Sequence, residues 1–240
     1  MPKPNLEWKV LPHGPLAEID TDLFVVEGQI PMPLVDLPRR MTIVRLKDLE
    51  LLVWSAISLE ESVMEQVEAL GRLTWLVVPG DHHRLDAAAW KLRYPQLKVV
   101  TPPGARERTE KVVPVDSTEP DFKDAGVQLL DVPGTHDEEA ALLLRRPGGS
   151  TLVLNDLVAN IRHASGFGGW LLRTMGFAGD KAQIPKSTEM LLVDCKAELR
   201  AQLLRWAELD DLKRIIVSHG EVIEHDPRRV LKELAESLGD

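Results

Sequence analysis

The stretch Leu73–Asp86 reads LTWLVVPGDHHRLD, and the predicted fold depends on it. Its first part, LTWLVV, is a nearly continuous apolar run, typical of a β-strand that is buried on both faces. A Pro-Gly turn ends the run, and four side chains that could act as ligands or proton carriers follow: Asp81, His82, His83 and Asp86. In layered α/β proteins the loops at such strand ends converge to form binding sites. We therefore expect a functional site at this strand exit.

The same pattern recurs further along the chain. Three more strand-like apolar runs lead into a histidine or an aspartate: His136, Asp156 and His219. Histidines and aspartates placed at random would not follow strand ends so regularly. Imidazole and carboxylate groups together suit Zn²⁺, Mn²⁺ or Fe²⁺. The sequence therefore predicts a site assembled from four distant segments, most simply around a metal ion.

Composition limits the classes of protein to which the chain can belong. Its 240 residues fit one α/β domain over 1–240, and the net charge of −9 argues against nucleic acid as a partner. No run approaches the roughly 18 apolar residues of a membrane helix, so we expect no membrane partner. The N-terminus lacks the apolar core of a signal peptide, and the single Cys195 fits a reducing compartment. We therefore expect a cytoplasmic protein with a small-molecule substrate, and a homo-oligomer is left open.

Apolar spacing and end signals predict the helices. Four segments have helical spacing: Ser58–Leu70, Leu85–Leu92, Asp194–Glu208 and Pro227–Leu238. Ser58, with Glu61 three residues later, is expected to form a capping box at the start of the first helix. Short β-branched runs before Ser58, and others between residues 112 and 154, predict strands. Residues 157–190 are less regular and rich in glycine, with Phe167, Trp170 and Phe177, which indicates an apolar lid. This order of elements predicts two sheets flanked by helices.

The order of these motifs resembles that of the metallo-β-lactamase superfamily. A strand leads to a His/Asp cluster and a helix, a Pro-Gly turn to a histidine, a strand to an aspartate, and a late strand to Ser-His-Gly. The chain looks especially similar to a poorly characterised bacterial branch, through His82-His83 before Tyr94-Pro95, the segment LNDLVAN and His219-Gly220. The resemblance covers about residues 23 to 230. It implies a four-layer αββα sandwich of two mixed β-sheets flanked by helices.

The resemblance also implies a role for each candidate residue. The first ligand cluster corresponds to His82 and His83, with Asp81 or Asp86 as the accompanying carboxylate that takes part in catalysis. The remaining ligands would be His136, Asp156, which matches the carboxylate that bridges two metals, and His219. The implied cofactor is a divalent metal, Zn²⁺ before Mn²⁺ or Fe²⁺. The implied reaction is hydrolysis of a small ester, thioester, lactone or phosphodiester by a metal-activated water.

The chain also departs from the family pattern. No His-x-His occurs anywhere, and the usual Pro-Gly-His is shifted by one residue to Pro133-Gly134-Thr135-His136. On an extended segment His82 and His83 would point to opposite sides. His83 could equally begin the next helix, His136 pair with a loop carboxylate, and Asp156 cap a turn. The departures leave room for a mononuclear site, or for a non-catalytic member of the fold that binds a small molecule or protein partner without a metal.

Overall fold

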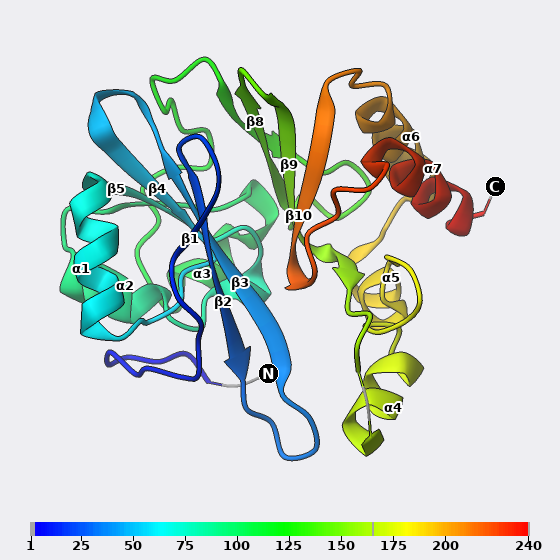
Figure 1. Ribbon diagram of the computed structural model, residues 1–240, viewed down its shortest axis with the longest axis horizontal. Coiled ribbons are helices and arrows are strands. Elements are labelled where there is room, and N and C mark those ends of the chain that lie inside the picture. Colours follow the sequence, from blue (N-terminus) through cyan, green and yellow to red (C-terminus); the bar gives the residue numbers. More distant parts are fainter. Residues whose placement is uncertain (1–2, 165, 240) are drawn as a thin grey trace. The chain divides into compact units, whose positions relative to one another are not determined.

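The computed structural model describes residues 3–164 and 166–239, and the chain divides into two compact units (Figure 1). The first unit extends to Ile30 and continues over Pro38–Ala125, whereas the second comprises Pro31–Leu37 and the chain from Gly126 onward. Each unit contains one mixed sheet and its own helices. The predicted α/β class with two mixed sheets is therefore confirmed. The prediction of a single domain stays a prediction.

The sheet of the first unit has six strands in sequential order. They are β1 (Ala17–Asp20), β2 (Leu23–Ile30), β3 (Leu37–Arg45), β4 (Glu50–Trp54), β5 (Arg72–Val77) and β6 (Lys98–Val100). β3 and β4 pair antiparallel, and β4, β5 and β6 pair parallel. The run LTWLVV thus forms a strand between two parallel neighbours, which explains its continuous apolar sequence.

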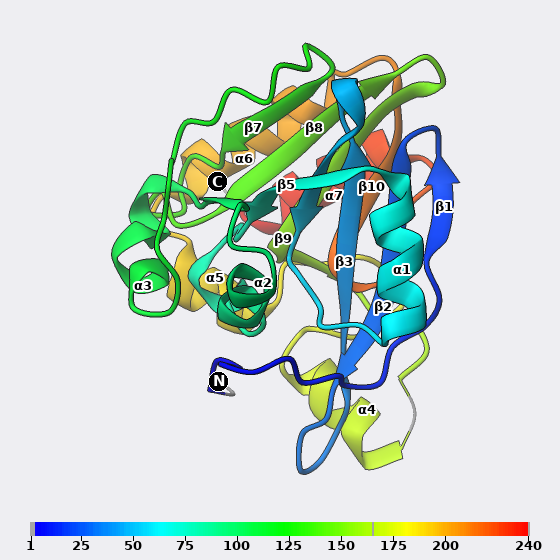
Figure 2. The ribbon, with the colours of Figure 1, turned by 90° about the vertical axis from the view of Figure 1, so that its left-hand side faces the viewer.

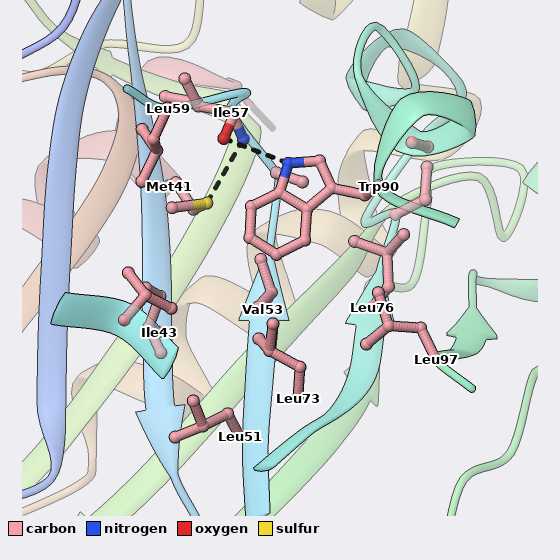
Figure 3. Packing of buried hydrophobic residues seen from close by; sticks show 14 of the residues in the cluster. Met41, Ile43, Leu51, Val53, Ile57, Leu59, Leu73, Leu76, Trp90 and Leu97 are labelled. Atoms are coloured by element: carbon pink, nitrogen blue, oxygen red, sulfur yellow. Dashed lines mark hydrogen bonds between the residues drawn. The ribbon is translucent and has the colours of Figure 1, made fainter. Parts of the chain in front are cut away.

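Helices connect the parallel strands of this unit. α1 (Glu61–Leu70) joins β4 to β5, α2 (Ala87–Arg93) joins β5 to β6, and α3 (Arg106–Glu110) comes later; the 3₁₀ turns are η1 (Lys47–Leu49), η2 (Asp81–His83) and η3 (Pro103–Ala105). α1 and α2 lie in front of the strands of this sheet in Figure 2, and their buried side chains form one apolar core with those of the strands. Trp90 is fully buried there, and its indole N–H donates to the Ile57 carbonyl at 3.1 Å (Figure 3). Burying this ring contributes roughly 2–3 kcal/mol.

The second unit has a four-stranded sheet in the order β10-β9-β8-β7. Its strands are β7 (Val127–Asp131), β8 (Ala140–Arg146), β9 (Gly149–Asn160) and β10 (Leu212–Gly220), and its helices are α4 (Gly166–Thr174), α5 (Lys186–Leu192), α6 (Lys196–Ala207) and α7 (Pro227–Ser237). β9 and β10 are parallel, whereas β8 is antiparallel to both of its neighbours. Residues of α6 and α7, such as Leu203 and Leu231, form a core with the apolar side chains of β9 and β10.

Several local predictions were wrong. α1 begins at Glu61, and the buried Ser58 does not cap it, because Glu60 occupies the N-cap position without a side-chain cap. Residues 112–115 form no strand. The region after Asp156 is more regular than expected, since β9 continues to Asn160 and two helices follow. The histidine pair lies in the 3₁₀ turn η2 rather than on an extended segment.

Candidate functional site

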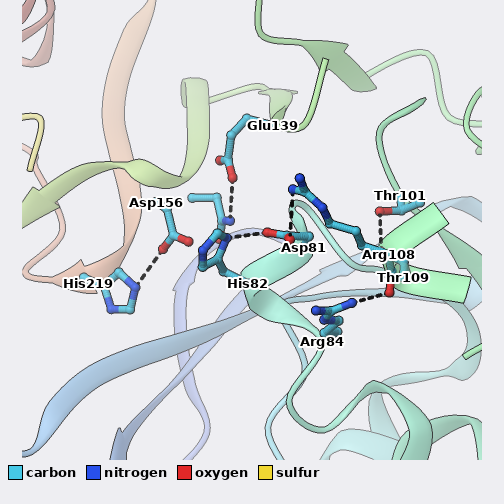
Figure 4. Close-up of polar contacts among 10 residues, drawn as sticks. Asp81, His82, Arg84, Thr101, Arg108, Thr109, Glu139, Asp156 and His219 are labelled. Atoms are coloured by element: carbon cyan, nitrogen blue, oxygen red, sulfur yellow. Dashed lines mark hydrogen bonds and ion pairs between the residues drawn. The ribbon is translucent and has the colours of Figure 1, made fainter. Parts of the chain in front are cut away.

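Asp156 of β9 and His219 of β10 lie side by side in the second unit. Asp156 Oδ1 is 2.9 Å from His219 Nε2 (Figure 4). The His219 side chain is buried, and the Asp156 side chain is only partly accessible. A carboxylate and an imidazole that are largely removed from water at hydrogen-bond distance stabilise each other and hold each other's orientation. The structure thus brings together two of the predicted metal ligands.

An irregularity in the sheet produces this contact. In the parallel ladder Val217 pairs with Leu154 and His219 pairs with Ala159, so β9 carries extra residues where β10 carries one. Such bulges bend a strand and redirect its side chains, often next to functional sites. Here the extra residues of β9 include Asp156. The bulge therefore gives a physical reason for a polar side chain within an otherwise apolar strand.

Hydrogen bonds of the residues that precede Asp156 and His219 hold the bulge. Ser218 donates from its hydroxyl to Asn155 Oδ1 at 2.8 Å, and Asn155 Nδ2 donates to Glu139 Oε1 at 3.4 Å. All three of these side chains are buried. A buried, hydrogen-bonded network of this kind specifies one local conformation, because breaking any of its bonds leaves a polar group without compensation. The network therefore positions the strand segments that carry Asp156 and His219.

Gly220 is required immediately after His219. Its φ is +105°, and a Cβ at this position would lie 2.2 Å from the Asn160 carbonyl oxygen. Any larger residue would push β10 away from β9. The ring of Phe177 contacts the His219 imidazole edge-on at 5.8 Å between centroids. The Ser-His-Gly motif is therefore explained by close backbone packing on one side and an aromatic contact on the other.

The chemistry of the pair fits a metal ion. Metal–ligand bonds of Zn²⁺ to histidine nitrogen and carboxylate oxygen are about 2.0–2.2 Å, so two ligand atoms of one tetrahedral ion lie about 3.4 Å apart. The contact of 2.9 Å between Asp156 and His219 is a hydrogen bond, and it brings two donor atoms of suitable chemistry together. Among the described residues of the second unit, no third histidine, cysteine or carboxylate donor lies within 4.8 Å of both. The pair alone is an incomplete ligand set, since zinc sites in proteins have at least three protein ligands.

His136 lies elsewhere in the second unit. It has a left-handed backbone with a φ of 53°, and its Nδ1 is 3.3 Å from Asp194 Oδ2. The preceding Pro-Gly turn packs tightly, because a Cβ on Gly134 would lie 2.2 Å from the Cys195 carbonyl oxygen. The His136 side chain is exposed, and its contact with Asp194 matches the alternative of a loop histidine paired with a carboxylate. Its role as a ligand stays a prediction.

In the first unit, Asp81 binds His82. Asp81 Oδ1 contacts His82 Nδ1, and Asp81 Oδ2 accepts from Arg108 Nη1 at 3.2 Å (Figure 4). The hydrogen bond with His82, followed by the charges of His82, Arg108 and Arg84, lowers the pKa of Asp81 despite its burial. Asp81 is therefore ionised at neutral pH. The sequence left Asp81 and Asp86 as alternative carboxylate partners of His82. In the structure the partner of His82 is Asp81.

His83 contacts a residue that the sequence analysis missed. The hydroxyl of Ser55 lies 2.5 Å from His83 Nδ1. Ser55 directly follows β4 and has a φ of 56°, a conformation that costs a non-glycine residue about 1–3 kcal/mol. With Nδ1 engaged, a metal contact from His83 would use Nε2. The sequence gives little signal for Ser55, because it stands inside the run LELLVWSAI and serine is not a usual metal ligand.

Asp86 is held by structural contacts. Its side chain has no exposed surface, and it accepts from Arg39 Nη1 at 2.6 Å and from Asn5 Nδ2 at 2.7 Å. Arg39 is itself buried. A buried carboxylate paired with a buried guanidinium neutralises a charge that would otherwise be costly. These contacts favour a structural role, and a catalytic role for Asp86 stays a prediction.

Comparisons with solved structures identify the fold. The chain is similar to the mono-zinc form of the metallo-β-lactamase FIM-1 from Pseudomonas aeruginosa, with 14% identity, a TM-score of 0.64, and coverage of 95% of this chain and 97% of that one. A metallo-β-lactamase from Hirschia baltica has 9% identity and a TM-score of 0.63 over 93% and 98% of the two chains. One from Pontibacter korlensis has 12% identity and a TM-score of 0.61 over 92% and 98%. No protein family and no curated protein matches the sequence. The predicted metallo-β-lactamase-like fold is thus confirmed.

Proposed function

We propose that this chain, which has the metallo-β-lactamase fold, is a metal-dependent hydrolase in which Asp156 and His219 are two of the metal ligands. The observation that supports the proposal is their contact of 2.9 Å at the bulged junction of β9 and β10. The fold adds support, because a similar solved structure is a mono-zinc metallo-β-lactamase. Zn²⁺ is the preferred ion, and Mn²⁺ or Fe²⁺ would suit the same donors.

Each partner of the pair has a distinct part in this proposal. A bound ion would supply a Lewis acid and would lower the pKa of a coordinated water from 15.7 toward about 7. His219 would offer a nitrogen whose orientation is set by the Phe177 contact and by Gly220. Asp156 would offer an oxygen and a negative charge, which offsets part of the charge of the ion. The network of Ser218, Asn155 and Glu139 would keep both donors in place when an ion binds.

Asp81 suits a positioning role in the same chemistry. Its pKa is lowered by its contacts with His82 and Arg108, so at neutral pH it is a carboxylate that accepts hydrogen bonds and cannot donate a proton. Its contact with Nδ1 of His82 fixes the orientation of that imidazole. His82 and His83 remain the proposed contributions of the first ligand cluster. The proposed substrates are small esters, thioesters, lactones or phosphodiesters.

A second candidate is a non-catalytic protein that retains the fold and binds a small molecule or a protein partner without a metal. The contacts of the other predicted residues favour it. His136 is paired with Asp194, and Asp86 with Arg39. Such partners can hold these side chains without an ion. The two candidates make opposite predictions about metal content.

Metal content measured by inductively coupled plasma mass spectrometry separates the candidates. The hydrolase proposal expects about one equivalent or more of Zn²⁺, Mn²⁺ or Fe²⁺ after purification or reconstitution, and expects Asp156→Asn and His219→Ala to lose most of it. The control is His225→Ala, which removes an exposed histidine of the same unit. His82→Ala and His83→Ala test the first cluster in the same assay. Circular dichroism establishes that each variant is folded.

Two outcomes would contradict the hydrolase proposal. One is a wild-type protein with less than about a tenth of an equivalent of metal that no added ion restores. The other is unchanged metal content in both Asp156→Asn and His219→Ala. A metal-loaded protein would then be screened against esters, thioesters, lactones and phosphodiesters, with the metal-free protein as the blank. Hydrolysis that follows metal loading would identify the substrate class.

A further inference from the structure

A segment of irregular backbone before β1 packs onto the first unit, and we call its residues 5–13 the strap. One end of the strap is fixed to β2, because the Pro12 carbonyl accepts from the Gln29 N–H at 2.9 Å. Residues 5–11 belong to no β-ladder and form no helix, and no helix elsewhere in the described part of the chain is long and apolar enough to cross a membrane. The strap is therefore held over residues 5–11 by individual contacts.

Asn5 joins the strap to the start of α2. Its backbone N–H donates to the Leu85 carbonyl at 2.7 Å, and its Nδ2 donates to Asp86 Oδ1 at 2.7 Å. Leu85 and Asp86 are the last two residues before α2, and they follow His82 and His83 of η2 by two to four residues. One residue of the strap thus binds two consecutive residues of the junction between η2 and α2.

This junction has no caps of its own. No side chain caps η2, and Asp86 occupies the N-cap position of α2 without accepting from an amide of that helix. An aspartate at an N-cap usually accepts from the first helical turn. Here the carboxylate binds Asn5 and Arg39 instead, which lie 81 and 47 residues away in the sequence. Because short helical turns without caps are weak by themselves, contacts that are distant in sequence must hold the junction.

Trp8 anchors the strap along α2. Its indole N–H donates to the Leu59 carbonyl at 2.9 Å, and its ring centroid lies 5.4 Å from that of Trp90. The guanidinium of Arg93 lies 4.6 Å from the Trp8 ring centroid. Trp90 and Arg93 both belong to α2, and aromatic and cation–π contacts add to the effect of burying the ring. The strap therefore contacts α2 at its start through Asn5 and along its length through Trp8.

We propose that Asn5 and Trp8 are positioning residues for the first ligand cluster. By holding the start of α2, they restrain His82 and His83. A shift of the junction would move both histidines, because they precede it by so few residues. Metal ligands must be held close to one geometry by the side chains that surround them. The value of this restraint for catalysis rests on the proposed function, whereas the restraint itself does not.

The strap can detach without unfolding the first unit. When Asn5 leaves, Asp86 keeps its ion pair with Arg39 at 2.6 Å, so no buried charge loses its partner. Segments with few buried contacts open at a lower free energy than a central sheet does. Loss of the strap contacts should therefore loosen the junction through local opening. A residue that merely stabilised the whole unit would act only through global unfolding.

Amide hydrogen exchange of the metal-free, full-length protein tests the proposal. The reporters are the His83 amide, which donates to Gly80, and the Ala87 amide, which donates to Arg84. Exchange of both should be about fivefold faster in Asn5→Ala, as expected for one lost hydrogen bond. It should be at least about tenfold faster in Trp8→Ala, and Trp8→Phe should restore part of the protection because it keeps a ring against α2. Nitrogen NMR should show shifted or broadened imidazole signals of the two histidines in both alanine variants.

Two control variants separate positioning from general stability. Leu6→Ala removes a side chain of the strap that is 67% exposed, and it should leave the reporters and the imidazole signals unchanged. Val67→Ala removes a fully buried side chain of α1. It should accelerate exchange in β3 and β4, which open by global unfolding, and leave the junction reporters at the wild-type rate. Circular dichroism establishes that each variant is folded.

The proposal fails on any of three results. One is a wild-type rate at the junction reporters in both Asn5→Ala and Trp8→Ala. Another is an acceleration of these reporters in Val67→Ala as large as in the strap variants, since the junction would then open only with the whole unit. The third is a set of unchanged imidazole signals. Because the protein carries no metal in these measurements, a failure of the hydrolase proposal would appear in metal content and not in these data.

Discussion

The exit of β5 in the first unit and the junction of β9 and β10 in the second unit both carry histidine and aspartate, but with different contacts. The residues of the first region follow a buried apolar strand, and those of the second lie within such strands. At the β5 exit each carboxylate has an arginine partner, since Asp86 binds Arg39 and Asp81 binds Arg108 as well as His82. At the junction Asp156 and His219 bind each other. The position of a carboxylate near a strand end indicates where a site can form. Whether that carboxylate has a structural role depends on the side chain that it contacts.

The largest expected effect is that of Asp86→Ala. The change leaves the buried Arg39 guanidinium without its carboxylate, which should lower the free energy of unfolding by roughly 3–5 kcal/mol. Urea denaturation at pH 7 measures the loss. Metal content, measured on the folded protein, should be unchanged if Asp86 is structural. A stability loss below about 1 kcal/mol together with lost metal would place Asp86 in the site and break the comparison.

Asp81→Asn should have a smaller effect that depends on pH. The pKa of Asp81 is lowered in the folded state, so ionised Asp81 stabilises the fold above its unfolded pKa of about 3.9, and this contribution disappears as the pH falls through the folded pKa. At pH 7 the variant should lose roughly 1–3 kcal/mol. Denaturation of both proteins between pH 7 and pH 3 measures the difference, which should shrink toward low pH. A difference that is constant over this range would show that the Asp81 charge is unimportant.

Ser55→Ala should have the smallest effect. It removes the hydrogen bond to His83 Nδ1, which should cost about 1 kcal/mol of stability. Ser55→Gly is the matched control, because it removes the same bond but relieves the positive φ. Nitrogen NMR of the His83 imidazole should show a change in tautomer population in both variants. An unchanged His83 spectrum would mean that Ser55 does not orient this histidine.

Much of the fold could be predicted because its signals are local. The continuous apolar runs of β5 and β10 and the spacing of α7 each occur within about a dozen residues, and the structure contains all three elements. Errors arose where a contact that is distant in sequence overrode a local signal. Ser58 has the sequence of a helix cap, yet it is buried and the helix starts later. His82 and His83 follow β5 and His219 is the second-last residue of β10, whereas Asp156 lies within β9. The partners of these residues could not be read from neighbouring residues.

By itself, the sequence determined the α/β class, most of the strands, the helices α1, α2, α6 and α7, and that several histidines and aspartates lie at or near strand ends. Hydrophobic periodicity and turn residues act over short distances, so these features are readable without a structure. Only the tertiary structure decided that Asp86 meets Arg39, 47 residues away, and that Asp156 meets His219, 63 residues away. The Asp156–His219 pairing depends on sheet register and on one bulge, because a shift of one residue would turn either side chain to the other face of the sheet. The Asp86–Arg39 pairing depends on how the start of α2 packs against β3.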